Sequence, residues 1–105
     1  MKQKLKKSLR AISRRLKEKY NAQKVILYGS HAAGKATRHS DVDLLVVAPT
    51  DEKLFWRMAT VRALVRDLRS GIPISPIVLT PKELNKRLKL KDPFISDIVK
   101  EGIVF

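Results

Sequence analysis

The chain has 105 residues, 44% of them hydrophobic, and its 23 lysines and arginines against 10 acids give a formal net charge of +13. This length suits a single domain over residues 1–105, and the hydrophobic content excludes a disordered tail. The absence of cysteine excludes disulfides and thiolate metal sites, which leaves a hard, oxygen-binding cation as the plausible metal. No apolar run approaches the roughly 20 residues of a membrane span, so we expect a cytoplasmic protein without a membrane partner.

The first predicted element is a basic amphipathic helix that ends near Asn21. Its apolar residues recur every three or four positions, at Leu5, Leu9, Ile12, Leu16 and Tyr20. Residues 2–19 also contain nine lysines and arginines and one acid. Such a field attracts polyanions, namely nucleic acid, nucleoside triphosphates or an acidic protein surface, although a solvated helix face explains it equally well. Nucleic-acid binding is therefore supported by net charge alone.

Two short apolar strands follow, joined by a Gly-Ser corner and a polar loop. The first strand is predicted over Lys24–Tyr28 and leads into Gly29 and Ser30, and the second includes Val42 and continues over residues 44–47. Glycine lets the backbone approach a ligand closely, so that successive amides and the Ser30 hydroxyl can meet phosphate oxygens. Taken alone, a Gly-Ser pair after a strand is more often a simple turn.

Asp41 and Asp43 stand at the start of the second strand. They are two positions apart on an extended segment, so both carboxylates point to the same face and repel each other. Solvent, a basic neighbour or a cation can relieve this repulsion, and magnesium takes one or two carboxylates together with substrate phosphates. The corner and the acidic pair together predict a site for a metal-bound triphosphate.

The loop between the corner and the acidic pair carries four further candidates. Lys35 and Arg38 are candidate nucleotide-binding residues that could neutralise a triphosphate, and a solvated loop explains them equally well. His31 could touch a phosphate and His39 could carry a proton, but both are more readily explained as ordinary polar loop residues.

A long helix is predicted to begin at Thr50, with acids in its first turn. Phe55 and Trp56 are interpreted as core or as a partner interface rather than as a base-stacking platform. The predicted apolar stripe is Leu54, Phe55, Met58, Val61, Leu64, Val65 and Leu68. The basic residues assigned to other faces are Lys53, Arg57, Arg62, Arg66 and Arg69.

The last third of the chain predicts a strand and two short helices. The strand covers Ile72–Thr80, where two prolines indicate a sheet edge or a bulge. One helix starts at Pro81 and the other runs over residues 94–100, before a short final strand at residues 103–105. This order of elements predicts an α/β, two-layer fold in which a small mixed β-sheet is flanked by helices.

The Gly-Ser pair, ten intervening residues and Asp-x-Asp resemble the signature of the DNA polymerase beta-type nucleotidyltransferase superfamily, in particular its minimal nucleotidyltransferase branch. The resemblance extends over the leading helix, the long helix, the IVLT strand with its TPKEL continuation and the closing EGIVF. It implies that Gly29 and Ser30 hold the phosphates and that Asp41 and Asp43 are catalytic residues that ligate Mg²⁺. The reaction it implies transfers a nucleoside monophosphate, AMP from ATP, to an acceptor hydroxyl.

The same resemblance suggests a partner and also shows a departure. Proteins of this branch resemble antitoxins paired with a helical HEPN ribonuclease toxin, which implies a HEPN-type partner and is compatible with a homo-oligomer. Active members carry a third carboxylate on the later strand, where this chain has Ser75. A serine hydroxyl is neutral at ordinary pH. The alternative function is therefore a catalytically weak or inactive module that binds nucleotide or toxin.

Overall fold

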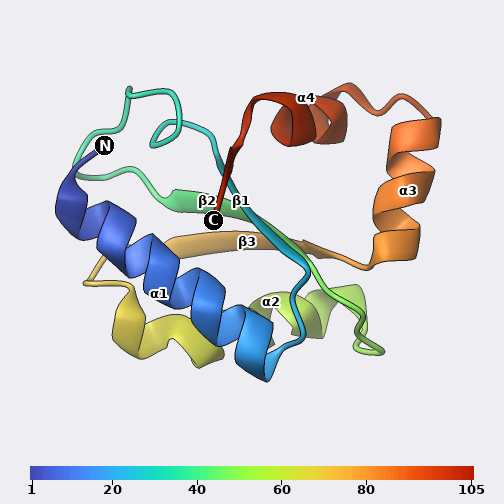
Figure 1. Cartoon of the computed structure of the whole chain (residues 1–105), viewed down its shortest axis with the longest axis horizontal. Helices are drawn as coiled ribbons and strands as arrows, with labels where there is room; N and C mark the ends of the chain where they lie inside the picture. The colour runs from blue at the N-terminus through green and yellow to red at the C-terminus, as the bar shows by residue number, and fades with distance from the viewer.

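The computed structural model describes all 105 residues as a mixed four-stranded sheet with helices on both faces (Figure 1). In chain order the elements are α1 (Gln3–Lys19), β1 (Lys24–Tyr28), β2 (Val42–Val47), α2 (Leu54–Val65), the 3-10 turn η1 (Arg66–Leu68), β3 (Ile74–Leu79), α3 (Pro81–Lys89), α4 (Pro93–Glu101) and β4 (Ile103–Val104). The strand order is β3-β2-β1-β4, in which β1 is antiparallel to both neighbours and β2 is parallel to β3. The predicted small mixed sheet flanked by helices is confirmed.

The two central strands are buried on both faces. Alternate residues point to opposite sides of a strand. Leu27, Leu44 and Val46 accordingly pack with α1 and α2, whereas Ile26 and Leu45 pack with α3 and α4. This double coverage explains why VILY and LLVV are continuous apolar runs rather than alternating ones. It also leaves only the strand ends free for polar chemistry.

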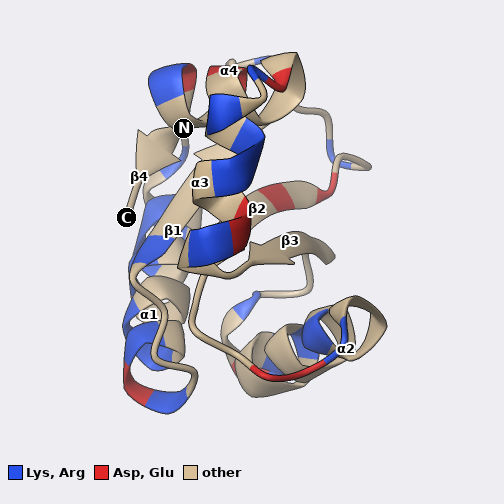
Figure 2. Ribbon diagram, turned by 90° about the vertical axis from the view of Figure 1, so that its right-hand side faces the viewer, with Lys and Arg blue, Asp and Glu red and all other residues tan.

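Helix α1 matches its prediction, and α2 does not. Leu9, Ile12 and Leu16 are buried, while lysines and arginines cover the outer side of α1 and also mark α3 (Figure 2). Helix α2 begins at Leu54, so the predicted start at Thr50 is wrong. Thr50 instead closes a local turn, in which its hydroxyl accepts a hydrogen bond from the Glu52 amide at 3.1 Å.

The predicted apolar stripe of α2 is also wrong in its first turn. Leu54, Phe55 and Met58 are exposed, Phe55 to 79%, and the face turned inward carries Arg57 and Val61. The buried positions of the helix are Arg57, Val61 and Val65, which are spaced by four. Because apolar side chains also continue around the outer side of the helix, the apolar periodicity of the sequence could not identify the buried face. The core interpretation of Phe55 and of its exposed neighbour Trp56 is therefore wrong, and the partner-interface interpretation stays a prediction.

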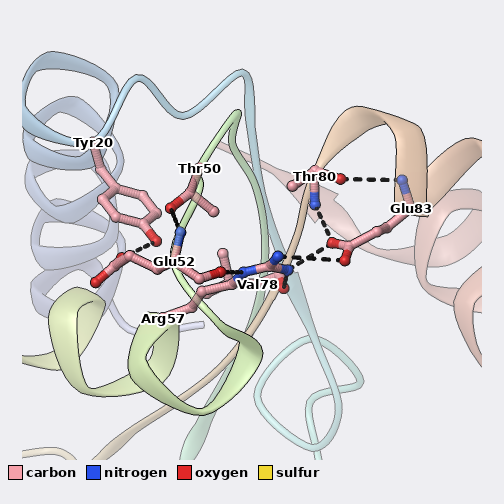
Figure 3. A network of polar contacts seen from close by, with 7 residues as sticks. All are labelled: Tyr20, Thr50, Glu52, Arg57, Val78, Thr80 and Glu83. Carbon is pink, nitrogen blue, oxygen red and sulfur yellow. Dashed lines mark hydrogen bonds and ion pairs between the residues drawn. The ribbon is translucent and has the colours of Figure 1, made fainter.

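Arg57 is buried, and hydrogen bonds to two backbone carbonyls and one carboxylate compensate its guanidinium group for the loss of water (Figure 3). Its Nε donates to the Glu52 carbonyl at 2.9 Å, and its Nη1 donates to the Val78 carbonyl at 3.2 Å. Both terminal nitrogens also donate to the Glu83 carboxylate, at 2.6 and 3.3 Å. Glu83 in turn forms a capping box with Thr80 at the start of α3. One ion pair thus joins α2, β3 and α3, contrary to the assignment of Arg57 to an outer face.

The remaining elements agree with their predictions in type and order, although β3 is shorter at both ends than the predicted Ile72–Thr80. Strand β3 lies at a sheet edge, where Pro76 pairs with Leu44 of β2, and β4 adds to β1 at the opposite edge. Helix α4 begins at Pro93, one residue before its predicted start, with Asp92 accepting hydrogen bonds from two amides of its first turn. No helix of the chain is long and apolar enough to cross a membrane.

We expect Arg57→Met to lower the free energy of unfolding by about 2 kcal/mol, because it removes the charged hydrogen bonds that join three elements. The Glu83 side chain keeps 42% of its surface exposed, and its solvation limits the loss. Urea denaturation of wild type and variant measures the change. Arg66→Met, at an exposed position, is the matched control and should stay within about 0.5 kcal/mol of wild type.

The same ion pair predicts a dependence on pH. The hydrogen bond from Arg57, the largest cause, lowers the pKa of Glu83 below its ordinary value of 4.5. The stabilisation by the ionised carboxylate is therefore complete above pH 4.5 and lost as pH falls through the lower folded-state value. The difference in unfolding free energy between wild type and Glu83→Gln should narrow on acidification. A constant difference from neutral to acid pH would contradict this assignment.

Candidate active site

The Gly-Ser corner and the predicted acidic pair meet at one end of the sheet, where β1 ends and β2 begins. Because the two strands are antiparallel, Tyr28, the last residue of β1, pairs with Asp43. Strand β3 runs parallel to β2 on the other side and pairs Ser75 with Asp43. Paired residues point to the same face of a sheet. Tyr28, Asp43 and Ser75 therefore form a row on the face that carries α3 and α4.

Gly29 lies directly against Asp43 of the acidic pair. Its φ of +76° is in the left-handed region, and a β-carbon at this position would collide with the Asp43 carboxylate. Hydrogen-bonded turns, rather than a helix, follow the corner. The Gly29 carbonyl accepts from the Ala33 amide at 3.0 Å, and the Ser30 carbonyl accepts from the Lys35 amide at 2.9 Å. The backbone of the corner and a carboxylate thus touch, which only glycine allows.

The two carboxylates differ in their surroundings. Asp41 is exposed and Asp43 is half-buried. Burial is the main cause that raises the pKa of Asp43, the negative charge of Asp41 raises it further, and His31 opposes both effects. A cation bound between the two carboxylates would relieve this repulsion.

The donor set fits magnesium held partly by a substrate. No group of three or more histidine, cysteine, aspartate or glutamate side chains forms a complete metal site in this chain. Magnesium is commonly bound by one or two carboxylates together with phosphates and water, rather than by a cage made only of protein ligands. Asp41 and Asp43 supply that number of carboxylates. Burial also raises the pKa of Tyr28 to about 12, so the neighbouring phenol stays neutral.

The two histidines are loop residues. The Nε2 atom of His31 lies 3.1 Å from the Ser40 carbonyl, so the ring ties together the two ends of the loop. His39 is exposed, and its backbone amide donates to the Thr37 hydroxyl at 3.3 Å. Both observations agree with the interpretation of these residues as polar members of the loop.

Lys35 and Arg38 are separated by the fold. Lys35 lines a groove of about 490 Å³ together with Gly29 and Ser30. Arg38 lines another hollow, of about 700 Å³, with His31 and the start of α1. Of the two predicted basic residues, Lys35 alone shares a cavity wall with the Gly-Ser corner.

The groove also contains residues that the sequence did not indicate. Its second wall is formed by α4 and includes Phe94, Asp97 and Glu101. Their spacing of three and four residues places them on one face of the helix. This periodicity was visible in the sequence, but nothing in it connected residues 94–101 with a corner more than sixty positions earlier.

The chain belongs to the nucleotidyltransferase domain family, whose model matches residues 9–105. Among its relatives are candidate protein adenylyltransferases of Methanocaldococcus jannaschii. One is 41% identical over 78 residues, which is 71% of this chain and 52% of that protein, so the match spans about half of that relative. A second is 31% identical over 100 residues, which is 93% of this chain and 94% of that protein.

A solved structure also resembles this fold. The crystal structure of a candidate nucleotidyltransferase from Sulfolobus solfataricus superposes with a TM-score of 0.60 at 23% identity, and the match covers 96% of this chain and 78% of that one. This likeness shows the shared fold.

The close contact of Gly29 with Asp43 predicts unequal effects of alanine at two glycines. Gly34 has a similar φ of +72°, but nothing lies within 4 Å of the position of its β-carbon. Gly34→Ala should lower the free energy of unfolding by about 1 kcal/mol through backbone strain alone. Gly29→Ala should cost about 1–3 kcal/mol more, because the Asp43 carboxylate must also move.

A double variant separates the two effects. Asp43→Ala removes the carboxylate that the new methyl group would meet, so Gly29→Ala in that background should cost about as much as Gly34→Ala. Thermal or urea unfolding is measured for five proteins, namely wild type, Gly34→Ala, Gly29→Ala, Asp43→Ala and the double variant. Equal costs for Gly29→Ala with and without the aspartate would show that the contact is not tight.

Proposed function

We propose that this protein is a magnesium-dependent protein adenylyltransferase, which transfers AMP from ATP to a hydroxyl group of a protein acceptor. The observation that carries the proposal is the contact of the Asp43 carboxylate with the backbone of Gly29, with Asp41 two residues away. A phosphate-binding corner and two metal-ligating acids serve one triphosphate only when they lie this close. The names of the Methanocaldococcus jannaschii relatives support AMP as the transferred group.

The residues of the site have distinct roles in this reaction. Asp41 and Asp43 would hold Mg²⁺, which supplies charge neutralisation at the phosphates when bound. The backbone at Gly29, the Ser30 hydroxyl and the Lys35 ammonium group would orient the triphosphate. The acceptor oxygen attacks the α-phosphorus, the bond from that phosphorus to the bridging oxygen breaks, and pyrophosphate leaves. Because Ser75 is neutral, the proton of the hydroxyl passes to solvent or to a group of the acceptor.

We further propose that the acceptor is a helical HEPN-type protein. The resemblance of the chain to antitoxins of such pairs supports this partner. A second supporting feature is the pair of exposed aromatic residues Phe55 and Trp56, because large apolar side chains left in solvent are typical of protein-interaction surfaces.

A second candidate function is binding of nucleotide or partner without turnover. Its support is the pairing of Ser75 with Asp43 in the sheet, at the position where a third carboxylate would act. The absence of any cluster of three acidic or histidine ligands points the same way. The two candidates differ only in whether a covalent bond to the acceptor forms.

A transfer assay distinguishes the two functions. The full chain is incubated with ATP labelled at the α-phosphate, Mg²⁺ and a purified HEPN-type protein as the candidate acceptor. We expect label on the acceptor, and a loss of roughly 100-fold or more in Asp43→Ala, because one of the two metal-ligating carboxylates is gone. Chelation of the metal should abolish the transfer.

Ser75→Asp tests the alternative. If the wild-type protein binds Mg-ATP and the acceptor but transfers no label, whereas Ser75→Asp does transfer it, the protein is a binding module with an incomplete site. Asp43→Ala in the Ser75→Asp background is the matched control and should be inactive. A wild-type protein that binds neither ATP nor the acceptor would contradict both functions.

A further inference from the structure

We infer that the nucleoside moiety of the bound triphosphate occupies the groove between the Gly-Ser corner and α4, with its base against Phe94 and its hydrogen-bond donors facing Asp97 and Glu101. This inference rests on the proposed function, because it starts from phosphates bound at Gly29 and Ser30.

The groove continues directly from the proposed phosphate site. Gly29, Ser30 and Lys35 form one wall, α4 forms the other, and the volume of about 490 Å³ lies within the range of about 300–1,000 Å³ usual for small-ligand pockets. A nucleotide whose phosphates lie at the corner therefore has space for its nucleoside without any movement of the chain.

The aromatic side of the groove suits a planar base. The rings of Tyr28 and Phe94 pack edge to face with centroids 5.7 Å apart at 85°, which positions the Phe94 ring against β1. Phe94 is nevertheless 51% exposed, while Tyr28 is half-buried beneath it. A fixed aromatic ring that remains half-exposed in a groove offers a stacking surface to a nucleobase of any identity.

The acidic side of the groove can provide selectivity. Ile98 is buried and holds α4 against the sheet, so Asp97 and Glu101 on either side of it are aligned along the groove. Neither carboxylate forms an ion pair, although the chain carries 23 lysines and arginines. Ionised carboxylates only accept hydrogen bonds, so they select ligand groups that donate. Adenosine offers two kinds of donor, the ribose hydroxyls and the exocyclic amino group of adenine.

The larger hollow beside Arg38 is a poorer match to a nucleoside. Its walls include Lys2, His31 and Arg38 but no acid and no aromatic ring apart from the histidine, and neither Gly29 nor Ser30 contributes to it. Its basic lining suits an anion. The hollow is also not continuous with the Gly-Ser corner, so a nucleotide whose phosphates lie at the corner would not reach it with its base.

Paired ligands separate the nucleoside subsite from the phosphate site. Calorimetric titrations with Mg-ATP and with Mg-tripolyphosphate, which has the phosphates but no nucleoside, are made on the full chain. Phe94→Ala should weaken ATP binding by roughly tenfold, because base stacking is lost, and leave tripolyphosphate binding within about twofold of wild type. Leu90→Ala, which truncates an exposed apolar side chain at the end of α3, is the control and should change neither.

A second variant guards against an effect on folding. Phe94→Leu keeps an apolar side chain against Tyr28 but removes the aromatic face, so it should fold like wild type and still bind ATP more weakly.

The double variant Asp97→Asn, Glu101→Gln tests the acidic wall. If the carboxylates accept from the ribose, the preference of wild type for ATP over dATP should shrink in this variant. If they accept from the base, the preference for ATP over inosine triphosphate should shrink.

Each outcome decides the inference. Unchanged ATP binding in both Phe94 variants, with tripolyphosphate still bound, would overturn the nucleoside subsite and leave the proposed function intact. Equal weakening of ATP and tripolyphosphate would also overturn it, since Phe94 would then act through the fold. If the wild-type protein binds neither ligand, the phosphate site itself fails, and the proposed function and the subsite fail together.

Discussion

The burial of β1 and β2 on both faces is the constraint on which the rest of the structure depends. Helices α1 and α2 cover one side and α3 and α4 cover the other, so nothing polar fits along the length of these strands. Charged groups can stand only where a strand begins or ends. The antiparallel pairing of β1 with β2 and the parallel pairing of β2 with β3 then bring three such ends to the same place.

The contact of Gly29 with Asp43 turns this edge into a candidate for phosphate chemistry. A side chain at residue 29 would push the backbone amides of the corner away from the Asp43 carboxylate. The groups proposed to bind the phosphates and the group proposed to bind the metal would then be too far apart to hold one metal-triphosphate complex. The half-burial of Asp43 and the charge of Asp41 raise the pKa of Asp43, so the pair favours an added positive charge. Packing and electrostatics therefore support the same ligand.

The fold and the motif could be predicted from the sequence because their signals are local. Continuous apolar runs define the strands, and the period of α1 defines its buried side. Helix α2 resisted prediction because its apolar residues extend around the helix, and because Arg57 is satisfied by Glu83, twenty-six residues away. Likewise, Asp41 and Asp43 could be proposed from their spacing, but the wall formed by Phe94 and α4 depends on long-range packing that no short pattern encodes.

The two outer strands have a further consequence for the protein in concentrated solution. VILY and LLVV are the type of segment that adds to other sheets through free backbone groups. On one side the sheet ends in β3, whose Pro76 has no amide hydrogen to offer, and on the other it ends in β4, which has only two residues. Both edges are thus blunted against pairing with another chain, and the segments most prone to aggregate are confined to the interior of the sheet.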